Sequence, residues 1–300
     1  MRVKKTNLIY LLVIGILAGC SDRANLSDAY GNFEVDDVII SSEANGKLIE
    51  FNVEEGKKIK ENLLAGVIDT TNLVLQRKQL MAQTVAVSSK IANIEAQIKV
   101  QEQQKKNLLV DKHRIENLIK DGAATQKQLD DINGAIDLVE SQIASIQTQY
   151  TAVTTELEVI KIQIAQVDES IAKCLIYNPM DGVVLEKYAE QNEVTAFGKP
   201  LYKIADMDEM ILRVYVSGAQ LPQIQIGQEV EVLIDEDKKS NRSLAGKVFW
   251  ISETAEFTPK IIQTKEERVN MVYAVKVRVK NDGRLKIGMP GEVNFTNKEN

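Results

Sequence analysis

Residues 129–174 read LDDINGAIDLVESQIASIQTQYTAVTTELEVIKIQIAQVDESIAKC and repeat an apolar pattern every seven residues. One row of this repeat contains Leu129, Ile136, Ile143, Tyr150, Leu157, Ile164 and Ile171, and the companion row contains Ile132, Val139, Ile146, Val153, Ile160, Val167 and Cys174. Because all fourteen positions are apolar or cysteine, the stretch predicts one arm of a coiled coil. Cys174 is accordingly predicted to be a buried seam residue and not a reactive thiol.

The preceding stretch keeps the same period less strictly. Its rows hold Leu73, Leu80, Val87, Ile94, Gln101, Leu108 and Ile115, with Thr84, Ile91, Ile98 and Ile119 in the second row, and they are interrupted by Arg77, Lys105 and Lys112. Between the two stretches, Gly122 is placed to end one helix and Thr125 to cap the next. Residues 71–173 are therefore predicted to form a helical hairpin with its tip at about residues 118–125. Arms of about 50 residues would be roughly 75 Å long.

Two similar segments flank the predicted hairpin. The first runs from Gly46-Lys47-Leu48-Ile49-Glu50 to Leu64-Ala65-Gly66-Val67-Ile68-Asp69, and the second runs from Gly182-Val183-Val184-Leu185-Glu186 to Leu201-Tyr202-Lys203-Ile204-Ala205-Asp206. Each has short apolar β-type runs, glycine turns and a closing aspartate. This internal repeat predicts one small β-sandwich, split into residues 42–70 and 174–206, with the hairpin inserted between its halves.

Residues 207–300 contain alternating apolar and polar side chains, as in Ile211–Val216 and Tyr273–Val279, which predict an antiparallel β-barrel. Residues 20–41 are predicted to be a linker followed by a first strand that packs on this barrel. Trp250 is predicted to lie in the barrel core, and the acidic run at residues 235–237 in a loop. The expected fold class is α+β and elongated.

The N-terminus predicts an exported protein. Residues 1–19 combine a basic start with an apolar run of about ten residues, shorter than the roughly 20 needed to span a bilayer, so we expect a cleaved signal peptide. The sequence Leu17-Ala18-Gly19-Cys20 resembles a bacterial lipobox, which implies lipid attachment at Cys20. The alternative is an ordinary signal with a chance cysteine. Acylation of Cys20 would leave Cys174 without a disulfide partner.

Composition argues against several classes of function. The 300-residue chain has a formal net charge of −6, 1 His and 2 Cys. A nucleic-acid partner is not expected, because such binding needs a basic face. The inventory also offers few ligands for a metal site, and neither a nucleophile elbow nor a phosphate-binding glycine loop is present. We therefore expect no enzyme activity, no cofactor and no metal. His113 and the acidic run are expected to be solvated.

The two flanking segments resemble the split lipoyl-like domain of the HlyD family of membrane fusion proteins. The resemblance is carried by residues 43–48 (EANGKL), 54–59 (EEGKKI) and 178–184 (NPMDGVV). Residues 257–259, 263–268 and 285–291 resemble the members that serve ABC-type exporters. The lysine hairpin that carries the cofactor in true lipoyl proteins is replaced here, and the sequence ends at Asn300 without the further domain of many proton-driven systems. The first departure disfavours cofactor carriage, and the second favours an ABC-type partner over a proton-driven pump.

The resemblance implies a periplasmic adaptor in a Gram-negative bacterium, lipid-anchored at the inner membrane. Its implied partners are an inner-membrane ABC transporter, with permease and ATP-binding subunits, and a TolC-like outer-membrane channel. Further copies of the chain would form a ring, which family analogy makes a hexamer. The alternatives are an adaptor of a proton-driven RND or MFS pump, a carrier protein, and an envelope coiled coil without a transport role.

Arg114, Leu118 and Thr125 match the spacing of the tip motif with which such adaptors meet TolC-like channels. The resemblance implies that these three residues dock the channel. An arginine would supply directional donors, a leucine an apolar contact and a threonine a small polar one. The simpler alternative is a solvated arginine, a leucine that supports the seam and a threonine that only caps a helix.

Overall fold

The computed structural model describes residues 27–237, 240–257 and 271–295. The chain divides into two compact units, one formed by Ile39–Ile204 and the other by the residues up to Val38 together with those from Ala205 onward. The predicted signal peptide, Cys20 and residues 263–268 lie outside the described residues.

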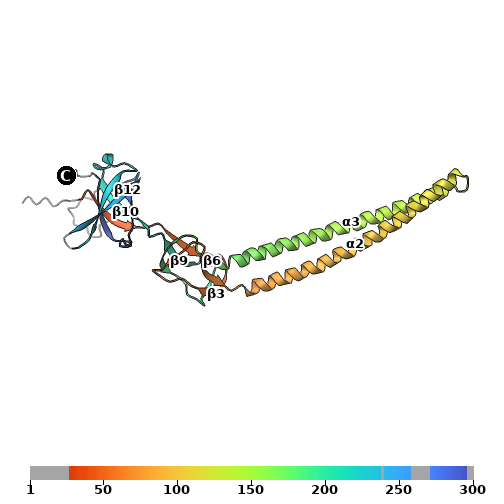
Figure 1. The fold of residues 1–300 in the computed structure, drawn as a ribbon, viewed down its shortest axis with the longest axis horizontal. Coiled ribbons are helices and arrows are strands. Elements are labelled where there is room, and N and C mark those ends of the chain that lie inside the picture. Colours follow the sequence, from red (N-terminus) through yellow and green to blue (C-terminus); the bar gives the residue numbers. More distant parts are fainter. Residues whose placement is uncertain (1–26, 238–239, 258–270, 296–300) are drawn as a thin grey trace, which may run out of the picture. The chain divides into compact units, whose positions relative to one another are not determined.

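The first unit contains two long helices that run side by side and are joined at one end (Figure 1). Helix α2 spans Thr71–Lys120 and helix α3 spans Gln126–Ala172, which is 50 and 47 residues. None of the apolar side chains predicted for the seam on either helix is exposed, and Val87, Ile94, Ile136, Val139, Ile160 and Val167 are fully buried. The helical hairpin and its seam are therefore confirmed. Cys174 is buried as predicted, but it lies beyond the end of α3 and belongs to the core of the adjoining sheets.

Two four-stranded sheets adjoin the helices. One has the order β2 (Asp37–Ser41), β9 (Pro200–Ala205), β7 (Gly182–Lys187), β4 (Lys58–Ile59), and the other has the order β6 (Leu175–Tyr177), β5 (Leu64–Ile68), β3 (Gly46–Phe51), β8 (Val194–Thr195). The two strand orders are equivalent: β2 in one sheet corresponds to β6 in the other, and in the same way β3 corresponds to β7, β4 to β8 and β5 to β9. The predicted internal repeat is thus present in the strand order, and each sheet takes strands from both sides of the hairpin.

The two halves of the repeat share one core and one buried polar contact. Leu48 and Ile68 come from the first half and Leu201 and Ile204 from the second, and all four are fully buried. Asn178, also fully buried, accepts a hydrogen bond from the Tyr202 hydroxyl at 3.0 Å and donates one to the Lys60 carbonyl at 2.9 Å. Because an unsatisfied buried amide is costly, this contact fixes the second half against the first.

The second unit is a closed antiparallel barrel. Its strands have the order β10 (Glu209–Ser217), β1 (Ala29–Glu34), β15 (Pro290–Asn294), β11 (Glu229–Asp235), β12 (Asn241–Ile251), β14 (Met271–Lys280), β13 (Glu256–Phe257), with a short 3-10 helix at Leu221–Gln223. Pairing of β10 with β14 closes the sheet. The core includes Phe33, Leu212, Val214, Val232 and Val277. Asp235 is the last residue of β11, and residues 236–237 follow it in the turn, so the loop predicted for residues 235–237 begins one residue later.

Trp250 is not in the core, so that prediction was wrong. The ladder between β12 and β14 shifts between Val248 and Trp250, so that Val248 pairs with Val277 and Trp250 pairs with Lys276. Such a bulge inserts an extra residue and reverses the alternation of side chains beyond it. Val248 is buried, whereas Trp250 is 39% exposed with the Lys276 ammonium 5.7 Å from its ring centre.

Gly31 on β1 lies close against the backbone of β10, because a Cβ added there would lie 1.8 Å from the Arg213 carbonyl oxygen. We expect Gly31→Ala to lower the free energy of unfolding of the barrel by about 1–3 kcal/mol, measured by urea unfolding. Gly218→Ala is the matched control, since its Cβ would lie 3.7 Å from the Tyr273 ring. Equal stability of the two variants would contradict the steric argument.

Burial raises the pKa of Tyr202 to about 12, above its ordinary value of 10.0. Because the unfolded chain loses this proton first, the stabilisation is fully present below pH 10 and is lost as the pH rises toward 12. Wild-type stability should fall by up to about 3 kcal/mol more than that of Tyr202→Phe over this range. Urea unfolding at several pH values measures the difference. Tyr177→Phe, which replaces an exposed tyrosine instead, is the matched control variant.

Candidate functional site

The helix α2 ends in a tight turn that places the tip residues. Gly122 has a φ of +70°, a conformation that glycine adopts without strain. Its N–H donates to the Ile119 carbonyl at 3.0 Å, and the Ala123 N–H donates to the Leu118 carbonyl at 2.7 Å. These bonds satisfy the last carbonyls of α2 and turn the chain back toward α3.

Thr125 begins α3 through a reciprocal cap. The Thr125 N–H donates to Oε1 of Gln128 at 2.8 Å, and the Gln128 N–H donates to the Thr125 hydroxyl at 3.4 Å. This is a capping box, which satisfies two backbone donors at the start of a helix. The capping role predicted for Thr125 is therefore confirmed, and its side chain lies at the exposed end of the hairpin.

Arg114 and Leu118 project from the last two turns of α2. They are four residues apart, so they share one side of the helix. The Arg114 side chain is 68% exposed, and its guanidinium donates to the Asp111 carboxylate at 3.0 Å, leaving further N–H groups for a partner. Leu118 is 40% exposed although it lies near the end of the seam. The structure thus brings an arginine, an apolar side chain and a capped threonine to the same end of the hairpin.

His113 is the histidine of this region, and its side chain is 76% exposed. Its Nε2 lies 3.3 Å from the Asn117 amide, and its Nδ1 lies 4.0 Å from Glu116. These are neighbours one turn away on the same helix. The arrangement fits the expected solvated side chain.

Ion pairs join the two helices at Arg77 and Lys105, two of the charged residues that interrupt the apolar rows of α2. The Arg77 guanidinium lies 2.7 Å from Asp168, and the Lys105 ammonium lies 2.8 Å from Glu140. Two weaker contacts, Lys90 to Glu156 at 3.8 Å and Tyr150 to Glu95 at 3.4 Å, lie between them. These pairs show which residues of α2 and α3 lie level with each other. Sequence reasoning missed them because a periodic pattern within one arm does not show which residue of the other arm lies opposite.

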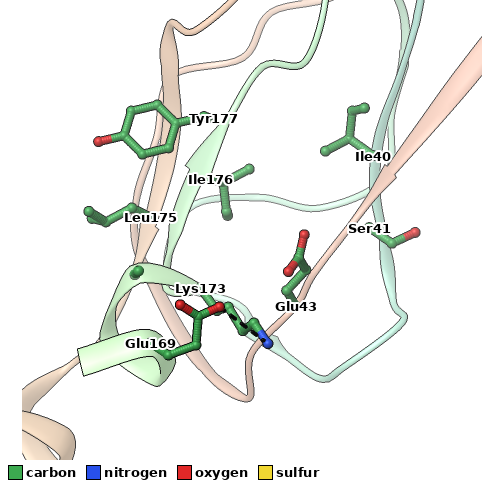
Figure 2. Close-up of a pocket in the computed structure, with 9 residues that line it drawn as sticks. Ile40, Ser41, Glu43, Glu169, Lys173, Leu175, Ile176 and Tyr177 are labelled. Carbon is green, nitrogen blue, oxygen red and sulfur yellow. Dashed lines mark ion pairs between the residues drawn. The ribbon is translucent and has the colours of Figure 1, made fainter. Parts of the chain in front are cut away.

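Small cavities surround the sheet end of the hairpin. Figure 2 shows one of about 300 Å³, lined by Ile40, Ser41, Glu43, Leu175, Ile176 and Tyr177, with the Glu169–Lys173 ion pair at its edge. A second, of about 630 Å³, opens where α2 and α3 separate, and its polar lining consists of Gln76, Gln83, Gln163, Gln166 and Ser170. Among the described residues, no group of three or more His, Cys, Asp or Glu side chains is arranged to hold a metal ion.

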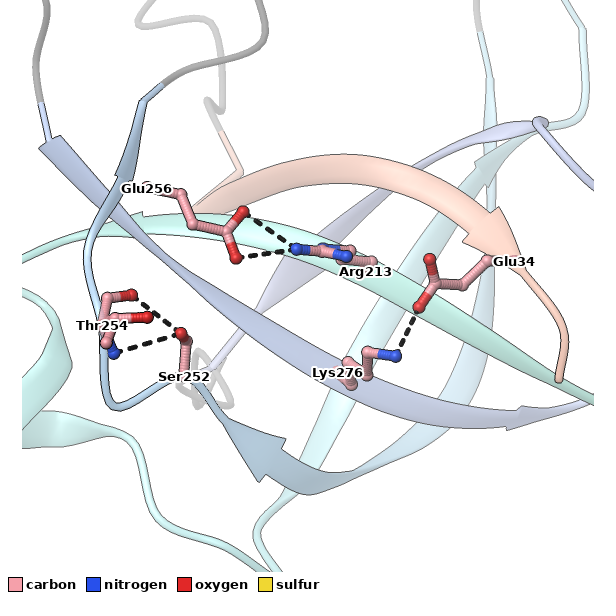
Figure 3. Close-up of polar contacts among 6 residues, drawn as sticks. All are labelled: Glu34, Arg213, Ser252, Thr254, Glu256 and Lys276. Carbon is pink, nitrogen blue, oxygen red and sulfur yellow. Dashed lines mark hydrogen bonds and ion pairs between the residues drawn. The ribbon is translucent and has the colours of Figure 1, made fainter.

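A paired set of charges lies on the outside of the barrel (Figure 3). The Arg213 guanidinium contacts both carboxylate oxygens of Glu256, at 2.8 and 2.9 Å, and the Lys276 ammonium lies 2.8 Å from Glu34. The four residues come from β10, β13, β14 and β1, and each is about a quarter to a third exposed. Alternation in Ile211–Val216 placed Arg213 on the outer face, but its partner depends on tertiary pairing and was not predicted.

Neither helix in the described ranges combines the length and the apolarity needed to cross a membrane.

Comparison with protein-family models gives no match. Curated relatives align over nearly the whole chain. The UPF0194 membrane protein in the asrC 5′ region of Acidithiobacillus ferridurans is 25% identical over 97% of this chain and 96% of that protein. YE2891 of Yersinia enterocolitica is 24% identical over 97% and 98%, and YbhG of Salmonella typhi is 26% identical over 96% of both. Both are also described as UPF0194 membrane proteins.

Two solved structures share the fold. MacA from Actinobacillus actinomycetemcomitans superposes with a TM-score of 0.57 at 18% identity, covering 91% of this chain and 79% of MacA. The membrane fusion protein Spr0693 from Streptococcus pneumoniae R6 gives 0.55 at 15% identity, covering 90% and 98%. The resemblance to membrane fusion proteins that the sequence motifs indicated is confirmed.

The capping box at Thr125 has a measurable consequence. Thr125→Ala should destabilise the first turn of α3 by about 1 kcal/mol, because it removes the side-chain acceptor of the Gln128 N–H and leaves that N–H only the Thr125 carbonyl, 3.1 Å away. Amide exchange in residues 126–129 should then quicken about fivefold. Thr125→Ser keeps the acceptor and should exchange at the wild-type rate. Equal exchange in Thr125→Ala and the wild type would show that the cap contributes nothing.

Proposed function

Because the chain has the fold of membrane fusion proteins over about nine-tenths of its length, we propose that it is a periplasmic adaptor. It links an inner-membrane ABC-type exporter to a TolC-like outer-membrane channel. The observation that carries the proposal is the helical hairpin with Arg114, Leu118 and Thr125 at its far end. A helix of 50 residues is about 75 Å long, a length suited to bridging distant partners.

The side chains at the hairpin tip suit binding to the end of a helix in a partner protein. The exposed Arg114 guanidinium offers several N–H donors in a planar fork, which suits carbonyl or carboxylate oxygens. Leu118 offers an exposed apolar side chain one turn farther along. Thr125 is held by its cap and keeps its hydroxyl at the turn. A helical end of the partner, with its unsatisfied carbonyls, matches this combination.

The anchoring of the adaptor rests on the N-terminal sequence. A diacylated Cys20 would hold the chain at the inner membrane without a spanning helix, and the curated relatives are described as membrane proteins. Both support a location in the cell envelope, with the bulk of the chain in the periplasm. The hairpin then reaches from the inner membrane toward the outer one.

The interrupted β-sandwich is proposed to be lipoyl-like, on the strength of its interleaved strand order and its motifs. A carrier would need an exposed lysine hairpin between the halves, and here α2 and α3 lie at that place in the chain. Adaptors of this type act as rings, so the sandwich and barrel layers would line a conduit and the hairpins would extend it. A ring of six copies is the family arrangement that we adopt.

The choice of an ABC-type exporter rests on residues 285–291, whose sequence LKIGMPG resembles that adaptor subgroup. A proton-driven RND or MFS pump is the second candidate for the inner-membrane partner. Copurification with a permease and an ATP-binding subunit distinguishes the two.

The tip gives the direct test of the proposed function. We expect the double variant Arg114→Asp, Leu118→Asp to lose binding to the outer-membrane channel by at least about tenfold, because it replaces a donor and an apolar contact with two like charges. Crosslinking in cells and export of a transported compound measure the effect. Circular dichroism should be unchanged, since both side chains are exposed.

Leu109→Asp is the matched control for the tip. Leu109 is 45% exposed on the same helix, nine residues before Leu118, which is about 13 Å away. It should retain channel binding. Undiminished export in the double tip variant, with an intact fold, would instead support an envelope coiled coil without a transport role.

A further inference from the structure

One connection of the barrel carries no charge. Although 27% of the residues in the chain are charged, none occurs between Arg213 and Glu229, where β10 leads through the 3-10 helix into β11. Within this stretch, Ile224 is buried in the barrel core, whereas Ile226 is 68% exposed. The uncharged connection therefore presents an apolar side chain to solvent.

A tight turn holds the exposed isoleucine. The Gln228 N–H donates to the Gln225 carbonyl at 3.2 Å, and Gly227 has a φ of +91°. This is a type II turn with Ile226 at its second position. The Gln225 N–H donates to Oε1 of Gln228 at 3.0 Å, and the Gly227 N–H donates to the Val248 carbonyl of β12 at 2.8 Å. The turn is thus fixed to the barrel, with the Ile226 side chain on its outside.

The connection satisfies much of its own backbone. Acceptors within the barrel receive the backbone N–H groups of Gln220, Gln223, Ile224, Gln225, Gly227 and Gln228. Two glutamine side chains also bond to the backbone: Oε1 of Gln220 accepts the Ser217 N–H at 2.9 Å, and the Gln228 amide donates to the Phe295 carbonyl at 2.7 Å. Because paired polar groups cost less to remove from water than free ones, this connection can approach an apolar phase.

The connection lies at the end of the barrel where β1 begins. The Gln220 amide donates to the Asp28 carbonyl at 2.8 Å, and the Asp28 carboxylate accepts the Phe295 N–H at 2.9 Å. Asp28 follows Cys20 by eight residues, and a fully extended chain of eight residues spans at most about 29 Å. An acyl group on Cys20 would therefore keep this end of the barrel close to the bilayer.

The opposite end of the barrel is charged. The connection from β14 to β15 lies beside the end of β1, since the Gly288 N–H donates to the Phe33 carbonyl at 2.7 Å. It contains three charged side chains, those of Asp282, Arg284 and Lys286. Charged groups are costly to bring against lipid. The two ends of the barrel therefore differ in chemistry, and the uncharged end is the one beside the N-terminal segment.

We infer that the Ile226 turn contacts the periplasmic leaflet of the inner membrane, with the isoleucine side chain at the boundary between lipid headgroups and acyl chains. This inference rests on the lipid anchoring that belongs to the proposed function. The anchor supplies the membrane affinity, and the turn sets which end of the barrel faces the bilayer. A stable protein interface needs a much wider patch than one isoleucine, whereas a bilayer accepts a single side chain beside an existing anchor.

Tryptophan fluorescence of the acylated full-length chain in phosphatidylcholine vesicles tests the inference. Trp250 is the one tryptophan of the chain, and Trp250→Phe removes its signal. In that background, Ile226→Trp should emit at least about twofold more weakly when the acyl chains of the lipid are brominated, because a tryptophan at the interface lies within reach of the quenching bromine atoms.

Ile287→Trp in the same background is the matched control. Ile287 is an exposed isoleucine in the charged connection at the other end of the barrel, so its emission should not depend on bromination. Thermal unfolding of both tryptophan variants should match that of Trp250→Phe, because both positions are exposed. Equal quenching at the two positions, or none at Ile226→Trp, would overturn the inference.

A protein partner at the turn would give a different result. If the Ile226→Trp emission ignores bromination and shifts only when the copurified exporter is added, the turn contacts the exporter and the assignment to lipid is wrong. An unmodified Cys20, detected by mass spectrometry, would remove the anchor and overturn the inference with it.

The outcome is distinct from that of the tip experiment. If quenching is selective for Ile226→Trp but the Arg114, Leu118 double variant exports normally, the membrane contact stands and the adaptor function fails. If the tip variant loses channel binding while Ile226→Trp is not quenched, the adaptor function stands and the membrane contact is wrong.

Discussion

The apolar seam between α2 and α3 is the constraint on which the hairpin depends. Isolated helices are marginal in water, and most side chains on the outer faces of these arms are polar or small. The seam supplies the burial that keeps both arms helical, from Leu73 to Ile171. The Arg77–Asp168 and Lys105–Glu140 pairs mark how far one arm lies along the other. The position of the tip follows from this pairing.

The sheets hold the two ends of the hairpin next to each other. Strand β5 leads into α2, strand β6 follows α3, and the two strands pair directly, with Val67 opposite Leu175. Both halves of the repeat end in the same local turn, in which an aspartate accepts a backbone N–H two residues later, Asp69 from Thr71 and Asp206 from Asp208. The bond from the Asn178 side chain to the Lys60 carbonyl joins the two halves. Both helices therefore adjoin a sheet whose strands come from before and after the hairpin in the sequence.

The sequence was most informative where a feature repeats. The heptads from Leu129 to Ile171 predicted α3 and its buried side, and Gly122 and Thr125 predicted the turn and the cap. It failed where geometry departs from the repeat. Trp250 is exposed because a bulge reverses the alternation of β12, and periodicity cannot locate a bulge. The place of the tip residues in the hairpin could be predicted from the sequence. The ion-pair partners of Arg77 and Arg213 could not, because each pair joins residues far apart in the chain.

Because β5 pairs with β6 at the base of the hairpin, the length of the hairpin can change only in fixed steps. Inserting seven residues in each arm restores every side chain to its own face of the helix and moves the tip outward by about 10 Å. Insertions of other sizes rotate one arm against the other and destroy the match between the two apolar rows. Because both arms start from neighbouring strands, such changes in reach leave the sheets untouched. The length of the hairpin can therefore change in whole heptads, independently of the sheets.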